Sequence, residues 1–196
     1  MLYANRMTLG LCLCMGVFLI NTCLTEKTER NEMLIKSEDV SYQSHKAGIT
    51  ISGTLTTPIN KKPVVTVILV PGYGPNDRDY ILMGHKRFFV LAEYLTQHGI
   101  AALRFDKRGI GKSTGEYGSA TSLDFADDVL AGIEYLKARK DIDSTKIGLI
   151  GHSEGGMISS MIAAESTDVA FVVLMAGVVQ ADIDGLVIQT AKQMKA

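Results

Sequence analysis

A short segment in the second half of the chain has the residue types and the spacing of a nucleophilic serine site. Residues 151–155 read GHSEG and fit the pattern G-x-S-x-G, with Ser153 at its centre. An apolar run over residues 146–150 precedes the segment, and a helical pattern begins at Glu154. In such a strand-to-helix turn the serine is held in a strained conformation that exposes its hydroxyl. We therefore expect Ser153 to attack an acyl carbon.

The residues around Ser153 are expected to shape the turn rather than to react. Glycine removes Cβ atoms that would clash with the neighbouring strand and helix. The glycines in question are Gly151, Gly155 and Gly156. The side chain of His152 is expected to point away from the serine hydroxyl and to serve packing or loop bonding. The alternative interpretation is a glycine-rich strand-to-helix turn with an incidental serine.

Attack on a carbonyl group creates an oxyanion, which needs hydrogen-bond donors in fixed positions. The helix that follows Ser153 would direct the Glu154 N–H group and its positive end toward that oxyanion. A second donor must come from the loop at residues 71–75 (PGYGP), where the Tyr73 N–H group has the right position. The competing interpretation is a plain surface turn. Further along this loop, we expect residues 77–79 (DRD) to form an ion pair that shapes it.

An alternating series of strands and helices is expected to position these residues. β-branched and apolar runs predict strands at residues 64–70, 100–105, 146–150 and 170–175. Helical patterns lie between them at residues 86–98, 122–139 and 154–164, with Ser122 as the cap of the second helix. This order favours an α/β fold with a mostly parallel sheet and helices on both faces. A β-hairpin from Val40 to Thr56 precedes it.

Four blocks of the sequence resemble the α/β-hydrolase superfamily, and in particular exported bacterial serine esterases of the dienelactone-hydrolase-like branch. The blocks lie at residues 70–79, 104–113, 148–156 and 171–177. The resemblance implies the α/β-hydrolase fold, a serine nucleophile that acts on small-molecule acyl esters, and no cofactor. Peptidase or thioesterase activity on the same fold remains open. Relatives often carry a smaller residue than Tyr73, so the acyl site is expected to be crowded there.

The histidines do not complete a catalytic triad. In this fold the triad runs Ser, then Asp or Glu, then His along the chain. The chain has four histidines, which are His45, His85, His98 and His152. None follows Ser153, and we expect none to be the general base. Residues 178–196 are interpreted as the start of a cap or insertion, so the triad acid is not identified either.

These gaps lead to two hypotheses about the whole chain. The first is that it is the amino-terminal portion of a serine hydrolase, truncated on the C-terminal side of the sheet and inactive alone. The second is a non-catalytic, lipid-anchored binding module that keeps the serine turn without its base. Residues 40–177 are the expected hydrolase core in both hypotheses. The sequence makes no prediction about the oligomeric state.

Several other functions are excluded by motif and charge. Residues 111–113 (GKS) resemble the end of a phosphate-binding P-loop, but the required glycine is replaced by Asp106, whose carboxylate would repel phosphate. The net charge of −1 provides no basic surface for nucleic acid. The three cysteines all lie near the amino terminus, which excludes a thiolate metal site in the core, and they are Cys12, Cys14 and Cys23. No metal is expected.

The amino-terminal segment has the pattern of an export signal. An apolar run from Leu9 to Ile20 follows Arg6 and is too short to cross a bilayer as a helix, so residues 1–22 are expected to be a signal peptide. The sequence before Cys23 resembles a relaxed bacterial lipobox, which makes Cys23 a candidate lipidation site and membrane anchor. Cleavage elsewhere or an uncleaved anchor are open alternatives. Residues 23–39 are interpreted as a polar tether of an exported periplasmic or cell-surface lipoprotein.

Overall fold

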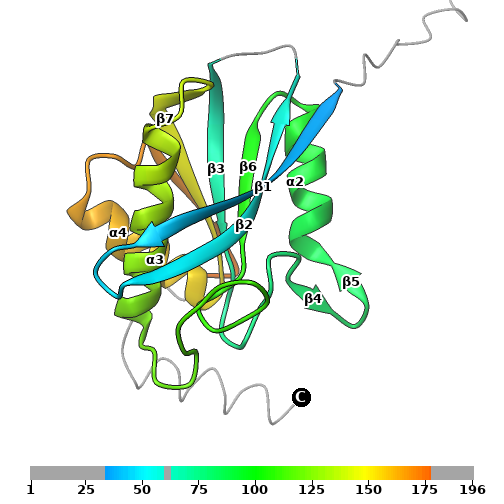
Figure 1. Cartoon of the computed structure of the whole chain (residues 1–196). Helices are drawn as coiled ribbons and strands as arrows, with labels where there is room; N and C mark the ends of the chain where they lie inside the picture. The colour runs from blue at the N-terminus through cyan, green and yellow to red at the C-terminus, as the bar shows by residue number, and fades with distance from the viewer. Residues whose placement is uncertain (1–33, 60–62, 178–196) are drawn as a thin grey trace, which may run out of the picture. The chain divides into compact units, whose positions relative to one another are not determined.

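A computed structural model describes residues 34–59 and 63–177 (Figure 1). Its main feature is a six-stranded sheet with the strand order β1-β2-β6-β3-β7-β8. The strands are β1 (Ile35–Ser44), β2 (Ile49–Pro58), β3 (Val64–Val70), β6 (Ala101–Phe105), β7 (Ile142–His152) and β8 (Phe171–Met175). β1 pairs antiparallel with β2, and β2 with β6, whereas the other neighbours are parallel. The expected mostly parallel sheet with an N-terminal hairpin is confirmed.

Helices cover both faces of this sheet (Figure 1). They are α2 (Arg87–Gln97), α3 (Ser122–Lys137) and α4 (Glu154–Glu165). Alternate residues of β3 point to opposite faces, as strand geometry requires. Val67 and Leu69 pack with Phe88 of α2, whereas Ile68 belongs to the cluster that includes Val129 of α3 and residues of α4. Two apolar layers therefore flank the sheet, and the expected α/β class with helices on both faces is confirmed.

The two central strands β3 and β7 are neighbours, but the chain leaves them in opposite directions. After β3 it leads to α2 on one face, and after β7 it passes directly into α4 on the other face. A crevice forms where neighbouring strands diverge in this way, and open α/β sheets bind their ligands there, at the carboxyl ends of the strands. The segment with Ser153 and the loop with Tyr73 border this switch point.

Three local features differ from the sequence expectations. β1 begins at Ile35 rather than near Val40, inside the segment interpreted as a tether, because backbone pairing with β2 does not require an apolar pattern. A small hairpin of β4 (Ile81–Leu82) and β5 (His85–Lys86) precedes α2 and was not expected. The cap of α3 is Thr121 and not Ser122, since Thr121 and Asp124 bond each other in a capping box.

β8 forms one edge of the sheet, and no described strand pairs with its outer side. Its apolar side chains are unusually open, with exposed fractions of 38% for Phe171, 44% for Val173 and Leu174, and 37% for Met175. The predicted signal peptide and the predicted cap lie outside the described residues. Within the described ranges, no helix combines the length and the apolar character that a bilayer crossing requires.

Candidate active site

Ser153 occupies a strained turn between β7 and α4. Its backbone angles are φ 54° and ψ −119°, a conformation that L-residues rarely adopt and that costs about 1–3 kcal/mol. Two hydrogen bonds hold the turn: Ser153 N–H donates to the Met175 carbonyl at 3.1 Å, and Gly156 N–H donates to the Ser153 carbonyl at 2.9 Å. The Ser153 side chain is only partly buried. The chain thus forces a serine into a sharp corner and leaves its side chain accessible.

The glycines beside Ser153 allow an unusually close approach of three backbone segments. A Cβ atom at Gly151 would collide with the Gly155 carbonyl, and one at Gly155 would collide with the Val70 carbonyl of β3. At Gly156 it would lie 2.8 Å from the Gly177 Cα atom. The start of α4 can therefore lie directly against β3 and β7 only because these side chains are absent.

The loop after β3 lies against the nucleophile turn. A Cβ atom added to Gly72 would be 3.1 Å from the Ser153 Cβ atom, so the two backbones touch. Within residues 34–59 and 63–177, the N–H groups of Tyr73 and Glu154 donate no hydrogen bond. The Tyr73 side chain is 83% exposed, so its ring projects into solvent instead of packing inside the site. The Gly72–Ser153 contact thus brings the two segments together, and neither expected donor has another acceptor within the described residues.

Asn76 holds the backbone of this loop. Its side-chain amide donates to the carbonyls of Gly72, Tyr73 and Gly74 at 2.9, 3.0 and 3.0 Å. One side chain thus binds three successive carbonyl groups and turns them to the same side. Because a carbonyl and the next N–H point in opposite directions across a trans peptide, this arrangement turns the N–H groups away from Asn76.

His152 bonds the loop and does not contact the serine hydroxyl. Its Nδ1 atom lies 2.9 Å from the Tyr80 hydroxyl, which also accepts a hydrogen bond from Gly72 N–H at 3.2 Å. Burial, and then the charge of Arg87, lower the pKa of His152. A neutral ring can accept the Tyr80 O–H proton at Nδ1 while Tyr80 accepts from Gly72. His152 therefore connects the nucleophile turn to the loop after β3.

Lys107 lies beneath these two segments, and the sequence analysis did not single it out. Its Nζ atom donates to the Gly72 carbonyl at 2.8 Å and to Glu154 Oε2 at 3.2 Å. The ammonium group also lies 4.3 Å from the centre of the Phe125 ring. Burial lowers its pKa. The available signal was its position just after a central strand, at the edge of the sheet where ligands bind.

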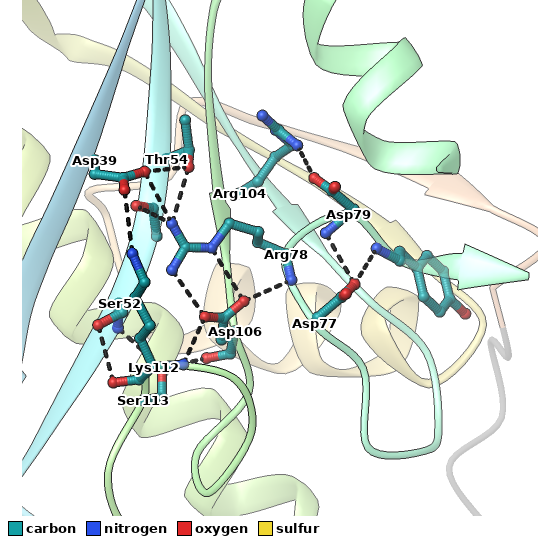
Figure 2. Close-up of polar contacts among 12 residues, drawn as sticks. Asp39, Ser52, Thr54, Asp77, Arg78, Asp79, Arg104, Asp106, Lys112 and Ser113 are labelled. Atoms are coloured by element: carbon teal, nitrogen blue, oxygen red, sulfur yellow. Dashed lines mark hydrogen bonds and ion pairs between the residues drawn. The ribbon is translucent and has the colours of Figure 1, made fainter. Parts of the chain in front are cut away.

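A second, partly buried cation, Arg78, joins the loop after β3 to the loop after β6 (Figure 2). Its guanidinium group binds the Asp106 carboxylate in a two-point contact, with Nε to Oδ1 at 3.1 Å and Nη2 to Oδ2 at 2.8 Å. Its Nη1 atom donates to the Gly53 carbonyl at 2.7 Å and to Thr54 Oγ1 at 2.9 Å. Asp79 forms a separate ion pair with Arg104. The ion pairing expected for residues 77–79 is present.

Asp106 also explains the P-loop-like segment. The Lys112 N–H donates to Asp106 Oδ2 at 3.1 Å, and the Ser113 hydroxyl donates to the Asp106 carbonyl at 2.7 Å. Burial by itself would raise the pKa of the Asp106 carboxyl, but the hydrogen bonds from Arg78 and Lys112 outweigh burial and hold this pKa below its ordinary value. The loop thus wraps a carboxylate of its own chain, which leaves no place for a phosphate.

No general base is found next to Ser153 in the described part of the chain. His152 Nδ1 is engaged by Tyr80, and His98 Nδ1 by the Tyr94 carbonyl at 2.7 Å at the end of α2. His85 lies in the exposed β5 strand, and His45 lies in the β1–β2 turn. The same residues contain no group of three His, Cys, Asp or Glu side chains that could hold a metal ion.

Comparison with known proteins gives one family match and several relatives. The family model described as "Serine aminopeptidase, S33" matches residues 62–195. The chain is 33% identical to esterase EstD of Thermotoga maritima over 116 residues, which cover 59% of this chain and 28% of EstD.

Solved structures show the same fold. The esterase Pf2001 of Pyrococcus furiosus has a TM-score of 0.65 at 25% identity, over 84% of this chain and 59% of that one. The α/β hydrolase GrgF of Penicillium has a TM-score of 0.65 at 24% identity, over 82% and 52%. The chain therefore spans less than two thirds of the length of each of these relatives.

Proposed function

The chain belongs to the serine aminopeptidase S33 family of α/β hydrolases, and we propose that its site is the nucleophile part of a carboxylic ester hydrolase. One observation carries the proposal. Ser153 stands in a strained, partly exposed turn, and the loop that contains Tyr73 touches this turn at Gly72. The N–H groups of Tyr73 and Glu154 donate no hydrogen bond within the described residues. A nucleophile with unpaired donors nearby is the arrangement that acyl transfer requires.

The proposed chemistry proceeds in two steps. The Ser153 Oγ atom attacks the ester carbonyl carbon, and the Tyr73 and Glu154 N–H groups stabilise the oxyanion that forms. The C–O bond to the alcohol then breaks, the alcohol takes up a proton, and an acyl-Ser153 ester remains. Water attacks this ester in the second step and releases the acid. No cofactor takes part in the proposed reaction.

The isolated chain of 196 residues is proposed to turn over very slowly. A neutral serine hydroxyl is a weak nucleophile until a base takes its proton. The four histidines are placed elsewhere or are already bonded, so the described residues supply no such base. Ser153 is still expected to react slowly with a strongly activated acyl or phosphonyl donor, because the oxyanion donors do not depend on the base.

The experiment treats the purified chain with a fluorophosphonate probe and locates the label by mass spectrometry. We expect one slow modification, at Ser153, that is absent in Ser153→Ala. Ser160→Ala is the matched control, because Ser160 is an exposed serine on α4 that bonds only the Gly156 carbonyl. A label on other serines, or none on Ser153 even at high pH, would contradict the proposal and favour a non-catalytic binding module.

Two versions of the proposal, an esterase and a peptidase, differ in the class of substrate. EstD and Pf2001 are named esterases, whereas the family is described as containing serine aminopeptidases. An ester is the easier substrate for a nucleophile without a base, because its alkoxide leaves more readily than an amine. Acylation of Ser153 by activated esters, thioesters and aminoacyl amides, followed by intact mass, distinguishes them. Modification by the ester alone supports the esterase, and equal modification by the amide supports the peptidase.

Export and lipidation at Cys23 are proposed as the cellular setting of this site. The proposal rests on the apolar run from Leu9 to Ile20 and the lipobox-like residues before Cys23. Expression in a bacterium with labelled palmitate should give a labelled membrane-bound protein. Cys23→Ala should lose the label, whereas Cys12→Ala and Cys14→Ala should keep it. Label in the Cys23→Ala protein would exclude this anchor.

A further inference from the structure

Lys107 is a buried ammonium group at the centre of the proposed active site. The residue is only 2% exposed and is among the largest fully buried side chains in the described part of the chain. A lysine in this position is costly, because the ammonium group loses its hydration, and an apolar side chain of similar size would be better for stability. The charge must therefore be explained by what it contacts.

The first contact fixes the peptide that contains one oxyanion donor. The Gly72 carbonyl and the Tyr73 N–H belong to the same planar trans peptide and point in opposite directions. Lys107 Nζ binds the carbonyl oxygen at 2.8 Å, so the N–H is directed to the opposite side of the loop. A cation on the oxygen also polarises the peptide and makes its N–H a stronger donor.

The second contact acts on the residue that carries the other donor. Glu154 Oε2 accepts from Lys107 at 3.2 Å, and Oε1 accepts from the Ser122 hydroxyl at 2.9 Å. These bonds fix the first residue of α4, whose N–H is the second donor. They also neutralise a carboxylate that stands next to the nucleophile, where its negative charge would oppose an oxyanion.

Comparison with Asn76 distinguishes the role of the Lys107 charge from the role of a neutral hydrogen-bond donor. It binds the same Gly72 carbonyl at 2.9 Å, so the carbonyl would keep one hydrogen bond if Lys107 were lost. Asn76 carries no charge and does not contact Glu154 in the described residues. Among the residues that the structure describes, Lys107 is the side chain that bonds both segments and the cation that pairs with the Glu154 carboxylate.

We propose that Lys107 is a positioning residue of the acyl-transfer site, which orients and polarises the Gly72–Tyr73 peptide and neutralises Glu154 so that both N–H groups can bind the oxyanion. This inference rests on the proposed function, since it needs Ser153 as nucleophile. Lys107 itself does not touch the substrate. It acts through the backbone on one side and through a carboxylate on the other.

The test measures the rate constant for modification of Ser153 by a fluorophosphonate. In this reaction Ser153 Oγ forms a bond to phosphorus, the P–F bond breaks, fluoride leaves, and water takes the hydroxyl proton. Charge develops on the phosphoryl oxygen, where the two N–H groups bind it. Lys107→Met should lower the rate constant about 10-fold or more, somewhat less than the loss of a donor itself. Lys112→Met is the matched control, because its 75% exposed side chain lies further along the same loop, and the rate constant of this variant should not change.

A pH profile distinguishes positioning from general support of the fold. Burial lowers the pKa of Lys107, so Lys107 loses its charge at a lower pH than a solvated lysine does. In the wild type, the rate constant for modification of Ser153, divided by the hydroxide concentration, should fall as the pH rises and Lys107 loses its proton. Lys107→Gln keeps an amide donor but no charge, so its profile should be low and flat. A wild-type profile without the fall would overturn the inference whether or not the variants fold.

The outcomes separate this inference from the proposed function. If the wild-type chain is not modified at Ser153, the proposed function fails. If the wild type is modified and the folded Lys107→Met protein reacts equally fast, only the role of Lys107 fails. Circular dichroism and a thermal melt establish whether each variant is folded. If Lys107→Met does not fold, Lys107→Gln and the wild-type profile decide the matter.

Discussion

The carboxyl ends of the central strands and the β8 edge of the same sheet are stabilised in opposite ways. At the strand ends, charged groups that are buried or partly buried have several partners each, as Arg78, Asp106 and Lys107 illustrate. At the edge, apolar side chains such as Val173 and Leu174 are 44% exposed, and pairing to β7 provides the main support. Specific polar contacts thus hold the site, whereas the apolar side chains of the edge stay partly exposed to water.

This contrast teaches that polar contacts between loops hold the site in addition to the apolar clusters below it. Arg78, for example, bonds both β2 and the loop after β6 from the loop after β3 (Figure 2). A polar network of this kind is stable only when every member has its partners. The loss of one member therefore lowers the free energy of unfolding by more than the loss of an exposed ion pair does. The predictions that follow test each half of the contrast.

The largest effect is expected from Asp106→Ala. The change leaves the Arg78 guanidinium largely buried without its carboxylate, and breaking a buried ion pair lowers the free energy of unfolding by about 3–5 kcal/mol. Urea denaturation measures it. Asp143→Ala is the control, because Asp143 bonds Thr145 and Lys146 at the surface and should matter little. A similar loss of unfolding free energy in both variants would show that the network around Asp106 contributes no more to stability than a surface contact does.

Gly155→Ala is expected to have the next largest effect. The new methyl group would meet the Val70 carbonyl, and neither backbone can move freely, so the start of α4 must shift. Overpacking of this kind costs about 1–3 kcal/mol. Fluorophosphonate labelling of Ser153 should fall at the same time. Gly118→Ala is the matched control, because a Cβ atom there meets only the end of the Glu116 side chain. Unchanged labelling in Gly155→Ala would mean that the close approach is not needed.

Acid should lower the stability that the polar contacts at the strand ends provide, and this loss should depend on Asp106. Its folded pKa is lower than its unfolded pKa, so its contribution to stability is fully present above the unfolded value of about 3.9. The contribution is lost as the pH falls through the folded pKa. Titration of the unfolding free energy for wild type and Asp106→Asn measures this effect. The gap between the two should close in acid, and a constant gap would contradict the assignment.

The smallest effect on the free energy of unfolding is expected at the edge. Val173→Lys should change it by about 0.5 kcal/mol or less, because the side chain is already open to water. The same change should reduce self-association, since a charge on an exposed strand opposes pairing with another chain. Val90→Lys on α2 is the control, as Val90 is exposed but not on a strand. Light scattering that falls equally in both variants would exclude a special role of β8.

The sequence predicted best where local chemistry and structure agree. The continuous β-branched run at Val64–Val70 became β3 with the same bounds, because a strand buried on both faces needs no other signal. The turn at Ser153 was likewise expected from its glycines, although only Gly151 meets its own segment, whereas Gly155 and Gly156 meet Val70 and Gly177. The Tyr73 and Glu154 N–H groups were chosen by position alone, because a backbone donor depends on topology and not on residue type, and their role as oxyanion donors stays a prediction.

The sequence failed where long-range contacts decide. Lys107 has the pattern of a solvated loop residue beside Arg108, and only the fold reveals that Glu154 and Gly72 enclose it. The segment interpreted as a tether was given an end that lies inside β1, because the polar residues of β1 show no apolar period. In the structure, Glu38 of β1 accepts a hydrogen bond from Arg139 at 3.2 Å. Thr121 and Ser122 are both good caps, and the choice between them depends on the position of Asp124.

The contacts of Arg78 have a consequence for the order in which the molecule assembles. This one residue bonds Thr54 and Asp106, which lie 24 and 28 positions away along the chain. Contacts between distant segments must overcome the entropy of closing large loops, and folding that depends on them is slow. We therefore expect the loops around Ser153 to reach their native arrangement late in folding. In a refolding time course, reactivity of the serine would report completion of the native state rather than collapse.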